Sequence, residues 1–163
     1  MALTSYAIAL GSNRRSRHGS PARTVRAAAD ALELESLSAI RSTVAVGPAG
    51  RSFANAAGLL RSPLDPLELL SKLKALEGDF GRRNGRRWGP RVLDLDIILW
   101  SGGAWADGQL VVPHPAFRGR GFVLEPLAQI AADWRDPMTG ATVRHLLHRL
   151  RQPRPVDRTG TRP

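Results

Sequence analysis

The sequence predicts an α+β fold, and three observations support this class. Short apolar runs typical of strands occur in four places along the chain: residues 4–11, 37–46, 52–61 and 92–99. Two longer segments, 21–35 and 66–80, carry apolar residues at the spacing of an amphipathic helix. The predicted order is therefore strand, helix, strand, strand, helix, strand.

The first strand and helix are separated by turn residues. The apolar run Thr4–Gly11 ends at Gly11-Ser12-Asn13, which is typical of a buried strand followed by a turn. Ser20 and Pro21 then provide an N-cap and a proline at the first helical position, which predicts a helix over 21–35.

The middle of the chain predicts two strands and a second helix. Segments 37–46 and 52–61 are separated by Gly47-Pro48-Ala49-Gly50, which indicates a connecting loop. Asp65 and Glu68 form a capping box around Pro66, so a helix is expected from 66 to about 80. Its predicted core stripe consists of Leu69, Leu73, Leu76 and Phe80.

The remaining segments complete the predicted fold. After the strand at 92–99, a small hairpin ends at Val111-Val112-Pro113, and helices are expected at 122–130 and 142–150. The order of the first six elements matches a ferredoxin-like αβ sandwich (βαββαβ core) with C-terminal additions. We expect a single domain over 1–150 and a basic, Pro/Arg-rich, disordered tail over 151–163.

Composition limits the possible functions. The chain has no cysteine, which excludes a disulfide framework, a thiolate metal site and a thiol nucleophile. Residues 1–6 lack the features of a signal peptide, and no apolar run approaches the roughly 18 to 20 residues of a membrane span, so we expect a cytoplasmic protein. The net charge of +10 arises mainly from arginine and favours phosphate-bearing ligands.

The most informative segment is residues 86–99, in which an arginine-rich loop leads into a strand carrying two carboxylates. Side chains alternate along a strand, so Asp94 and Asp96 should share one face while Leu93, Leu95 and Ile97 point to the other. Two neighbouring carboxylates repel each other unless a positive group lies between them. Carboxylate oxygens suit Mg²⁺, so the segment predicts a metal and phosphate site.

Alternatives from the residues alone remain open at this point. Asp94 and Asp96 could simply face water and pair with Arg87 or Arg91. The arginines and aromatic residues could also belong to a basic RNA-binding module, although acids on a nucleic-acid face would repel the phosphate backbone. His145 and His148, spaced i, i+3, are interpreted as a solvated helix face.

Other residues could form the rest of a ligand site. Phe53 and Asn55 share a strand face and would present an aromatic wall beside an amide, which suits a planar heterocycle, although a core phenylalanine with a turn-capping asparagine is the simpler reading. His114 follows a stiff Val112-Pro113 segment and is either structural or, with Arg120, a phosphate donor.

Five motifs, in the same order along the chain, resemble the 6-hydroxymethyl-7,8-dihydropterin pyrophosphokinase family. The most specific is Arg87-Trp88-Gly89-Pro90-Arg91-Val92-Leu93-Asp94-Leu95-Asp96-Ile97-Ile98. The others are Ala9-Leu10-Gly11-Ser12-Asn13, Phe53-Ala54-Asn55-Ala56-Ala57, Val112-Pro113-His114-Pro115 and Arg120-Gly121-Phe122-Val123-Leu124-Glu125-Pro126-Leu127.

The resemblance implies transfer of diphosphate from ATP to the hydroxymethyl group of 6-hydroxymethyl-7,8-dihydropterin, giving AMP and the dihydropterin diphosphate in folate biosynthesis. It implies ATP as co-substrate, two Mg²⁺ ions held by Asp94 and Asp96, and a monomer without membrane or nucleic-acid partners. Arg82 and Arg91 would act with these two aspartates in catalysis.

The resemblance also implies two sets of binding residues. The ATP site would comprise Lys74, Glu77, Arg82, Arg87, Trp88, Arg91, Ile97, His114 and Arg120. The pterin site would comprise Thr43, Val44, Val46, Phe53, Asn55, Trp88, Asp94 and Phe122. The loop at 43–47 lacks the prolines typical of the family, which predicts a less rigid pterin contact there.

Overall fold

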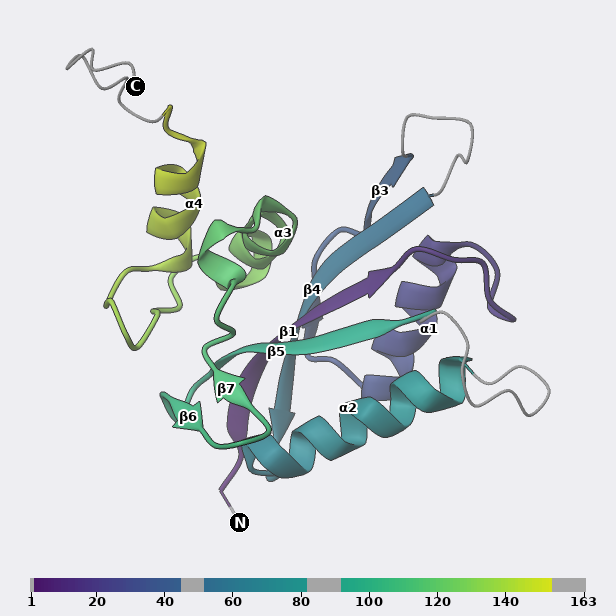
Figure 1. The fold of residues 1–163 in the computed structure, drawn as a ribbon, viewed down its shortest axis with the longest axis horizontal. Helices are drawn as coiled ribbons and strands as arrows, with labels where there is room; N and C mark the ends of the chain where they lie inside the picture. The colour runs from purple at the N-terminus through teal and green to yellow at the C-terminus, as the bar shows by residue number, and fades with distance from the viewer. Residues whose placement is uncertain (1, 45–51, 82–91, 154–163) are drawn as a thin grey trace, which may run out of the picture.

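The computed structural model describes residues 2–44, 52–81 and 92–153 (Figure 1). The six elements of the core are β1 (Thr4–Ser12), α1 (Pro21–Leu32), β2 (Ser36–Leu37) with β3 (Arg41–Val44), β4 (Ser52–Ser62), α2 (Pro66–Gly81) and β5 (Asp94–Trp100). The additions are β6 (Trp105–Ala106), β7 (Val111–Val112), the short 3₁₀ helix η1 (Phe117–Gly119), α3 (Gly121–Ala131) and α4 (Val143–Arg151).

One expected strand differs from the structure. Instead of a continuous strand over 37–46, two short strands, β2 and β3, pair with different parts of β4. Between them the chain leaves the ladder at Ser38, whose backbone N–H donates to the Ala57 carbonyl and whose hydroxyl accepts from the Ala57 N–H. The apolar pattern of 37–46 predicts strand residues, but it does not reveal the break at Ser38, which involves a hydrogen bond from the backbone to a side chain.

The sheet is antiparallel and places β1 at its centre. The strand order is β2-β4-β1-β5, with β3 beside β4 as well. This is the ferredoxin-like order expected from the sequence. The register pairs Gly11 of β1 with Asn55 on one side and with Asp94 on the other. Two polar residues from distant parts of the chain are thus brought to either side of one glycine.

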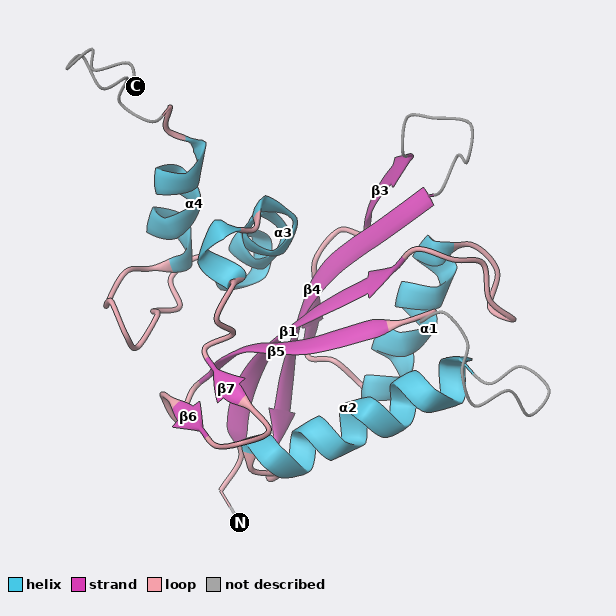
Figure 2. Cartoon of the chain, viewed as in Figure 1, coloured by secondary structure: helices cyan, strands magenta, loops and turns pink. Residues whose placement is uncertain are grey.

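Helices cover both faces of the sheet (Figure 2). Helices α1 and α2 pack on one face over a core that includes Tyr6, Ile8 and Leu10 of β1. Helix α3 packs on the opposite face against β4 and β1, and α4 packs on α3. This second core includes Ala7 and Leu124. Successive side chains of β1 point to opposite faces of the sheet, so this strand contributes residues to both cores.

The predicted helix starts are confirmed. The Ser20 hydroxyl accepts a hydrogen bond from the Arg23 backbone N–H at 3.3 Å, as an N-cap does. At α2, the Glu68 N–H donates to Asp65 Oδ1 at 2.8 Å and the Asp65 N–H donates to Glu68 Oε1 at 3.1 Å, which completes the capping box.

The C-terminal additions are joined by a partly buried ion pair. Arg118 in η1 donates from Nε to Asp136 Oδ2 at 2.5 Å and from Nη2 to Oδ1 at 2.9 Å. Asp136 is fully buried and also accepts from the Met138 N–H and the Thr139 hydroxyl. These donors hold the pKa of Asp136 at about 2. The loop between α3 and α4 is thereby fixed to the segment that leads into α3.

Candidate active site

A cavity of about 400 Å³ opens on the α3 face of the sheet, where the ends of β1, β4 and β5 meet the start of α3. Its polar side chains come from elements far apart in sequence. Its lining consists of Ala9–Asn13, Phe53, Asn55, Ala56, Glu77, Asp94, Asp96, Ile98, His114, Arg120, Phe122 and Val123. The cavity therefore combines carboxylates, aromatic rings, an amide and two basic side chains.

Asp94 and Asp96 lie side by side on one face of β5, as the alternation predicted. Both are exposed and line the cavity, whereas Leu95 between them is 1% exposed and packs in the core on the other face. Carboxylate oxygens are hard ligands that fit Mg²⁺. No group of three or more His, Cys, Asp or Glu side chains with metal-binding geometry occurs among the described residues.

Two aromatic rings on different elements line the same cavity. Phe53 of β4 is 37% exposed, and Phe122 at the start of α3 is 55% exposed. Phenylalanine is normally buried, so two accessible rings beside one cavity indicate a surface for a flat apolar ligand. The Arg120 guanidinium carbon lies 5.7 Å from the centre of the Phe122 ring.

Asn55 lies between the aromatic residues and the carboxylates. It is opposite Gly11, and a Cβ atom on residue 11 would stand 3.1 Å from Asn55 Oδ1. The absence of a side chain at Gly11 leaves room for this amide. An amide offers two donors and an acceptor, which can read the edge of a heterocycle.

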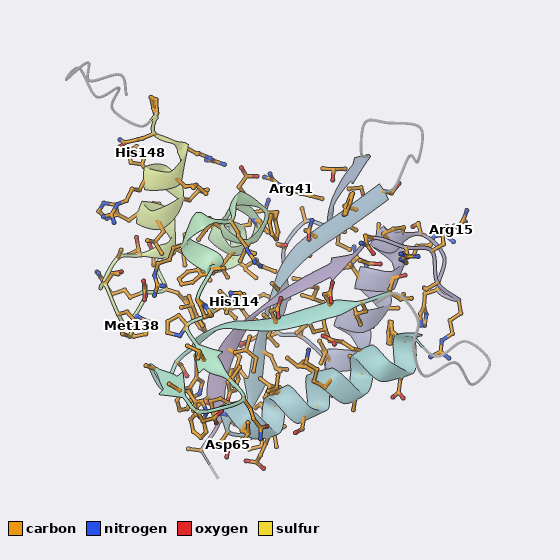
Figure 3. The ribbon with its side chains drawn as sticks, in the orientation of Figure 1. Arg15, Arg41, Asp65, His114, Met138 and His148 are labelled. Atoms are coloured by element: carbon orange, nitrogen blue, oxygen red, sulfur yellow. The ribbon has the colours of Figure 1, made fainter. Side chains whose placement is uncertain are left out.

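His114 enters the cavity from the segment after β7, and Figure 3 shows it beside β5, close to the start of α3. Its backbone N–H donates to the Ile98 carbonyl at 3.0 Å, which fixes the segment against β5. Ring atom Nδ1 accepts from the Ala116 N–H at 3.1 Å. A ring with an accepting Nδ1 carries its proton on Nε2, so Nε2 can donate to an anionic ligand.

Other expected site residues lie elsewhere. The Ile97 side chain is 3% exposed in the core on the opposite face and does not line the cavity. Thr43 pairs with Phe53 across the β3–β4 ladder but does not line the cavity either. Lys74 does not line the cavity, and its ammonium group contacts Glu77. For Val44 the structure describes the backbone but not the side chain. Arg82, Arg87, Trp88, Arg91 and Val46 lie outside the described residues.

Several residues that line the cavity were missing from those expected to bind ligands. Gly11, Ser12 and Asn13 line the cavity at the end of β1, and Ile98 and Val123 supply apolar walls. The turn residues at 11–13 predicted where the first strand ends, but they did not predict that this strand lies between β4 and β5. His145 and His148 are exposed on α4 (Figure 3 labels His148), away from the cavity, which confirms the solvated-face interpretation.

Comparison with known proteins decides the family. The model of the 7,8-dihydro-6-hydroxymethylpterin-pyrophosphokinase (HPPK) family matches residues 7–132. The chain belongs to this family. The matched segment contains every residue that lines the cavity. The HPPK motifs thus account for the carboxylates, the aromatic rings and the amide together.

Curated relatives and a solved structure agree with the HPPK assignment. A Synechocystis sp. protein named 2-amino-4-hydroxy-6-hydroxymethyldihydropteridine pyrophosphokinase is 41% identical over 119 residues, which are 73% of this chain and 61% of that protein. The Pseudomonas aeruginosa protein of that name is 40% identical over 137 residues, which are 80% and 82% of the two chains. A Plasmodium falciparum HPPK-DHPS structure with pteroate has a TM-score of 0.65 at 12% identity, covering 91% of this chain and 43% of that one. This last likeness shows the fold alone.

The HPPK chain contains no candidate transmembrane helix in its described part. None of the helices there combines the length and the apolar character needed to cross a bilayer.

Proposed function

We propose that this HPPK family member transfers diphosphate from ATP to the hydroxymethyl group of 6-hydroxymethyl-7,8-dihydropterin, giving AMP and the dihydropterin diphosphate for folate biosynthesis. One observation carries the proposal: a single cavity joins the Asp94 and Asp96 carboxylates to the exposed rings of Phe53 and Phe122. A phosphate-metal end and a heterocycle end therefore lie side by side.

The pterin occupies the aromatic end in this proposal. Phe53 and Phe122 stack on the two faces of the ring, and Asn55 bonds to its amide edge. The family resemblance implies further pterin contacts from Thr43, Val44, Val46 and Trp88. Stacking fixes the plane of the pterin and the amide fixes its rotation, so the hydroxymethyl group points toward Asp94.

The ATP phosphates occupy the carboxylate end. Asp94 and Asp96 would hold Mg²⁺, because Mg²⁺ is usually bound by one or two carboxylates together with substrate phosphates. The family resemblance implies two such ions. His114 and Arg120 also line the cavity, and both would donate to phosphate oxygens. The family resemblance implies that Arg82, Arg87 and Arg91, which lie outside the described residues, also bind the phosphates.

The reaction is an in-line displacement at the β-phosphorus. The pterin hydroxyl oxygen forms a bond to that phosphorus while the bond to the bridging oxygen of AMP breaks, and the hydroxyl proton is lost to solvent. Mg²⁺ held by Asp94 and Asp96 would supply neutralisation of charge on the phosphate oxygens. The protein's part is to place the two substrates and to stabilise the developing charge with Arg82, Arg91 and His114.

The test is AMP formation by purified protein with ATP, Mg²⁺ and the hydroxymethyl pterin. We expect AMP only when the pterin is present, and its loss in Asp94→Ala and Asp96→Ala. Absence of AMP from folded protein would contradict the proposal. RNA binding with steep salt dependence and no need for Mg²⁺ would instead favour a nucleic-acid module.

We also propose that the protein is a cytoplasmic monomer whose substrates are small molecules. The described cavity is lined by carboxylates, aromatic rings and an amide of a single chain, which supports a monomer. Sedimentation velocity at micromolar concentration should give a single species near the chain mass of 17.7 kDa. A stable dimer would contradict this part of the proposal.

A further inference from the structure

Glu77 reaches from helix α2 to the outer edge of strand β5. The Leu95 backbone N–H donates to Glu77 Oε1 at 2.8 Å. The Glu77 side chain is only 11% exposed, although it also borders the cavity. A carboxylate this deeply buried needs partners for both oxygens.

Leu95 lies between the two aspartates on β5. In the sheet order β2-β4-β1-β5, β5 is an edge strand. One side of β5 pairs with β1, and across the described ranges no strand pairs with its other side. The Leu95 N–H therefore takes its hydrogen bond from a side chain instead of a neighbouring strand. An unpaired amide there would carry a desolvation cost or open toward water.

The second oxygen of Glu77 has a cation beside it. Lys74 Nζ lies 3.3 Å from Glu77 Oε2, one helical turn away on α2. The lysine offsets the charge of a carboxylate that stands near two other carboxylates. Both oxygens of Glu77 thus have protein partners, which indicates a structural role for the group.

We propose that Glu77 is a positioning residue that acts through the main chain. Its hydrogen bond to Leu95 holds the Asp94–Asp96 segment in an extended conformation, and this keeps both carboxylates directed into the cavity. The role differs from a direct contact with the nucleotide, because the acceptor atom is used by the protein's own backbone. It rests on the proposed metal role of Asp94 and Asp96.

Three substitutions of Glu77 distinguish the effect of its hydrogen-bond acceptor from the effect of its negative charge. Glu77→Gln keeps an oxygen at the same reach but removes the charge. Glu77→Asp keeps the charge but is one methylene shorter and does not reach Leu95. Glu77→Ala removes both. Glu35→Gln, at an exposed glutamate outside the cavity lining, is the matched control.

The first measurement is hydrogen exchange of the Leu95 amide by NMR, without nucleotide or metal. We expect exchange about tenfold faster in the Asp and Ala variants, the effect of losing one net hydrogen bond, and close to wild type in the Gln variant. The Ile8 amide in the central strand serves as an internal reference for global stability. Unchanged Leu95 exchange in both the Asp and Ala variants would overturn the proposal.

The second measurement is Mn²⁺ affinity, read by electron paramagnetic resonance with a nonhydrolysable ATP analogue. We expect several-fold weaker Mn²⁺ binding in the Asp and Ala variants and near-normal binding in the Gln variant. The opposite ranking, with Asp near normal and Gln impaired, would show that the charge itself is needed and would overturn the positioning role. Asp94→Ala and Asp96→Ala test the metal site separately.

Discussion

Gly11 and Asn55 face each other across the β1–β4 ladder at the floor of the cavity, and the space above Gly11 is taken by the Asn55 amide. The same glycine pairs with Asp94 on its other side. One residue without a side chain therefore separates the amide proposed to bind the pterin from a carboxylate proposed to bind metal. The distance between the two substrates' sites is set by this register.

Gly11→Ala should weaken pterin binding. A Cβ 3.1 Å from Asn55 Oδ1 is too close, so the amide must shift away from its position on the floor. We expect about tenfold weaker pterin affinity, which corresponds to roughly 1.4 kcal/mol. Titration of pterin fluorescence in the presence of an ATP analogue measures it. Gly108→Ala, where a Cβ meets nothing within 4 Å, is the control. Equal affinities in the two variants would contradict this reading.

Asp96→Asn should abolish most activity while leaving the fold intact. The substitution keeps the size of the exposed side chain but removes the negative charge that Mg²⁺ requires. We expect AMP formation to fall about a hundredfold or more, as for loss of one charge-stabilising group. Asp133→Asn is the matched control, since its pair with Arg144 is exposed on both sides. Comparable rates in the two variants would exclude a metal role for Asp96.

Phe122→Leu should lower pterin affinity and spare ATP. Leucine remains apolar but removes a ring that is 55% exposed and contributes little to the core. Aromatic stacking is worth about 0.5 to 1.5 kcal/mol beyond buried area, so we expect roughly a three- to tenfold loss. Separate titrations with the pterin and with an ATP analogue measure the two effects. A larger effect on ATP than on the pterin would contradict the proposed stacking.

The Arg118–Asp136 pair should make stability depend on pH in the acid range. The Asp136 pKa is lowered from 3.8 to about 2, chiefly by its hydrogen bonds from Arg118. A lowered carboxyl pKa stabilises the folded protein above the unfolded pKa, and the contribution is lost as pH falls toward the folded value. The full contribution is roughly 2 kcal/mol.

Urea denaturation of wild type and Asp136→Asn measures this contribution. At pH 7 the variant should be less stable by at least that amount, because Arg118 loses its charged partner. The difference should shrink as the pH falls from about 5 to 2, where the wild-type carboxyl becomes protonated. A constant difference over that range would show that Asp136 does not titrate with the folding equilibrium.

Several features could be predicted because they depend on neighbours in the chain. The Asp65–Glu68 capping box and the Ser20 cap involve residues three apart, so sequence spacing alone determines which groups meet. The common face of Asp94 and Asp96 follows from strand alternation in the same way. The motifs around these residues also placed the chain in its family, which the family match confirms.

Other features depended on contacts between distant segments. The resemblance assigned Ile97 to ATP, but the Ile97 side chain packs in the opposite core. The hydrogen bond from the Leu95 N–H to Glu77 joins residues 18 positions apart, which no local spacing indicates. The interruption at Ser38 likewise arises from its bonds to Ala57. No local pattern encodes such pairings, because each requires a partner that folding brings from elsewhere.

The element order, the helix caps, the pair of carboxylates on one strand face and the family all follow from the amino-acid sequence. The place of Gly11 between Asn55 and Asp94, and the contact of Glu77 with the edge of β5, follow from the three-dimensional arrangement of the strands and helices. The physical reason is that caps and alternation follow from backbone geometry over a few residues. Strand register and edge contacts instead result from the packing of two cores on one sheet.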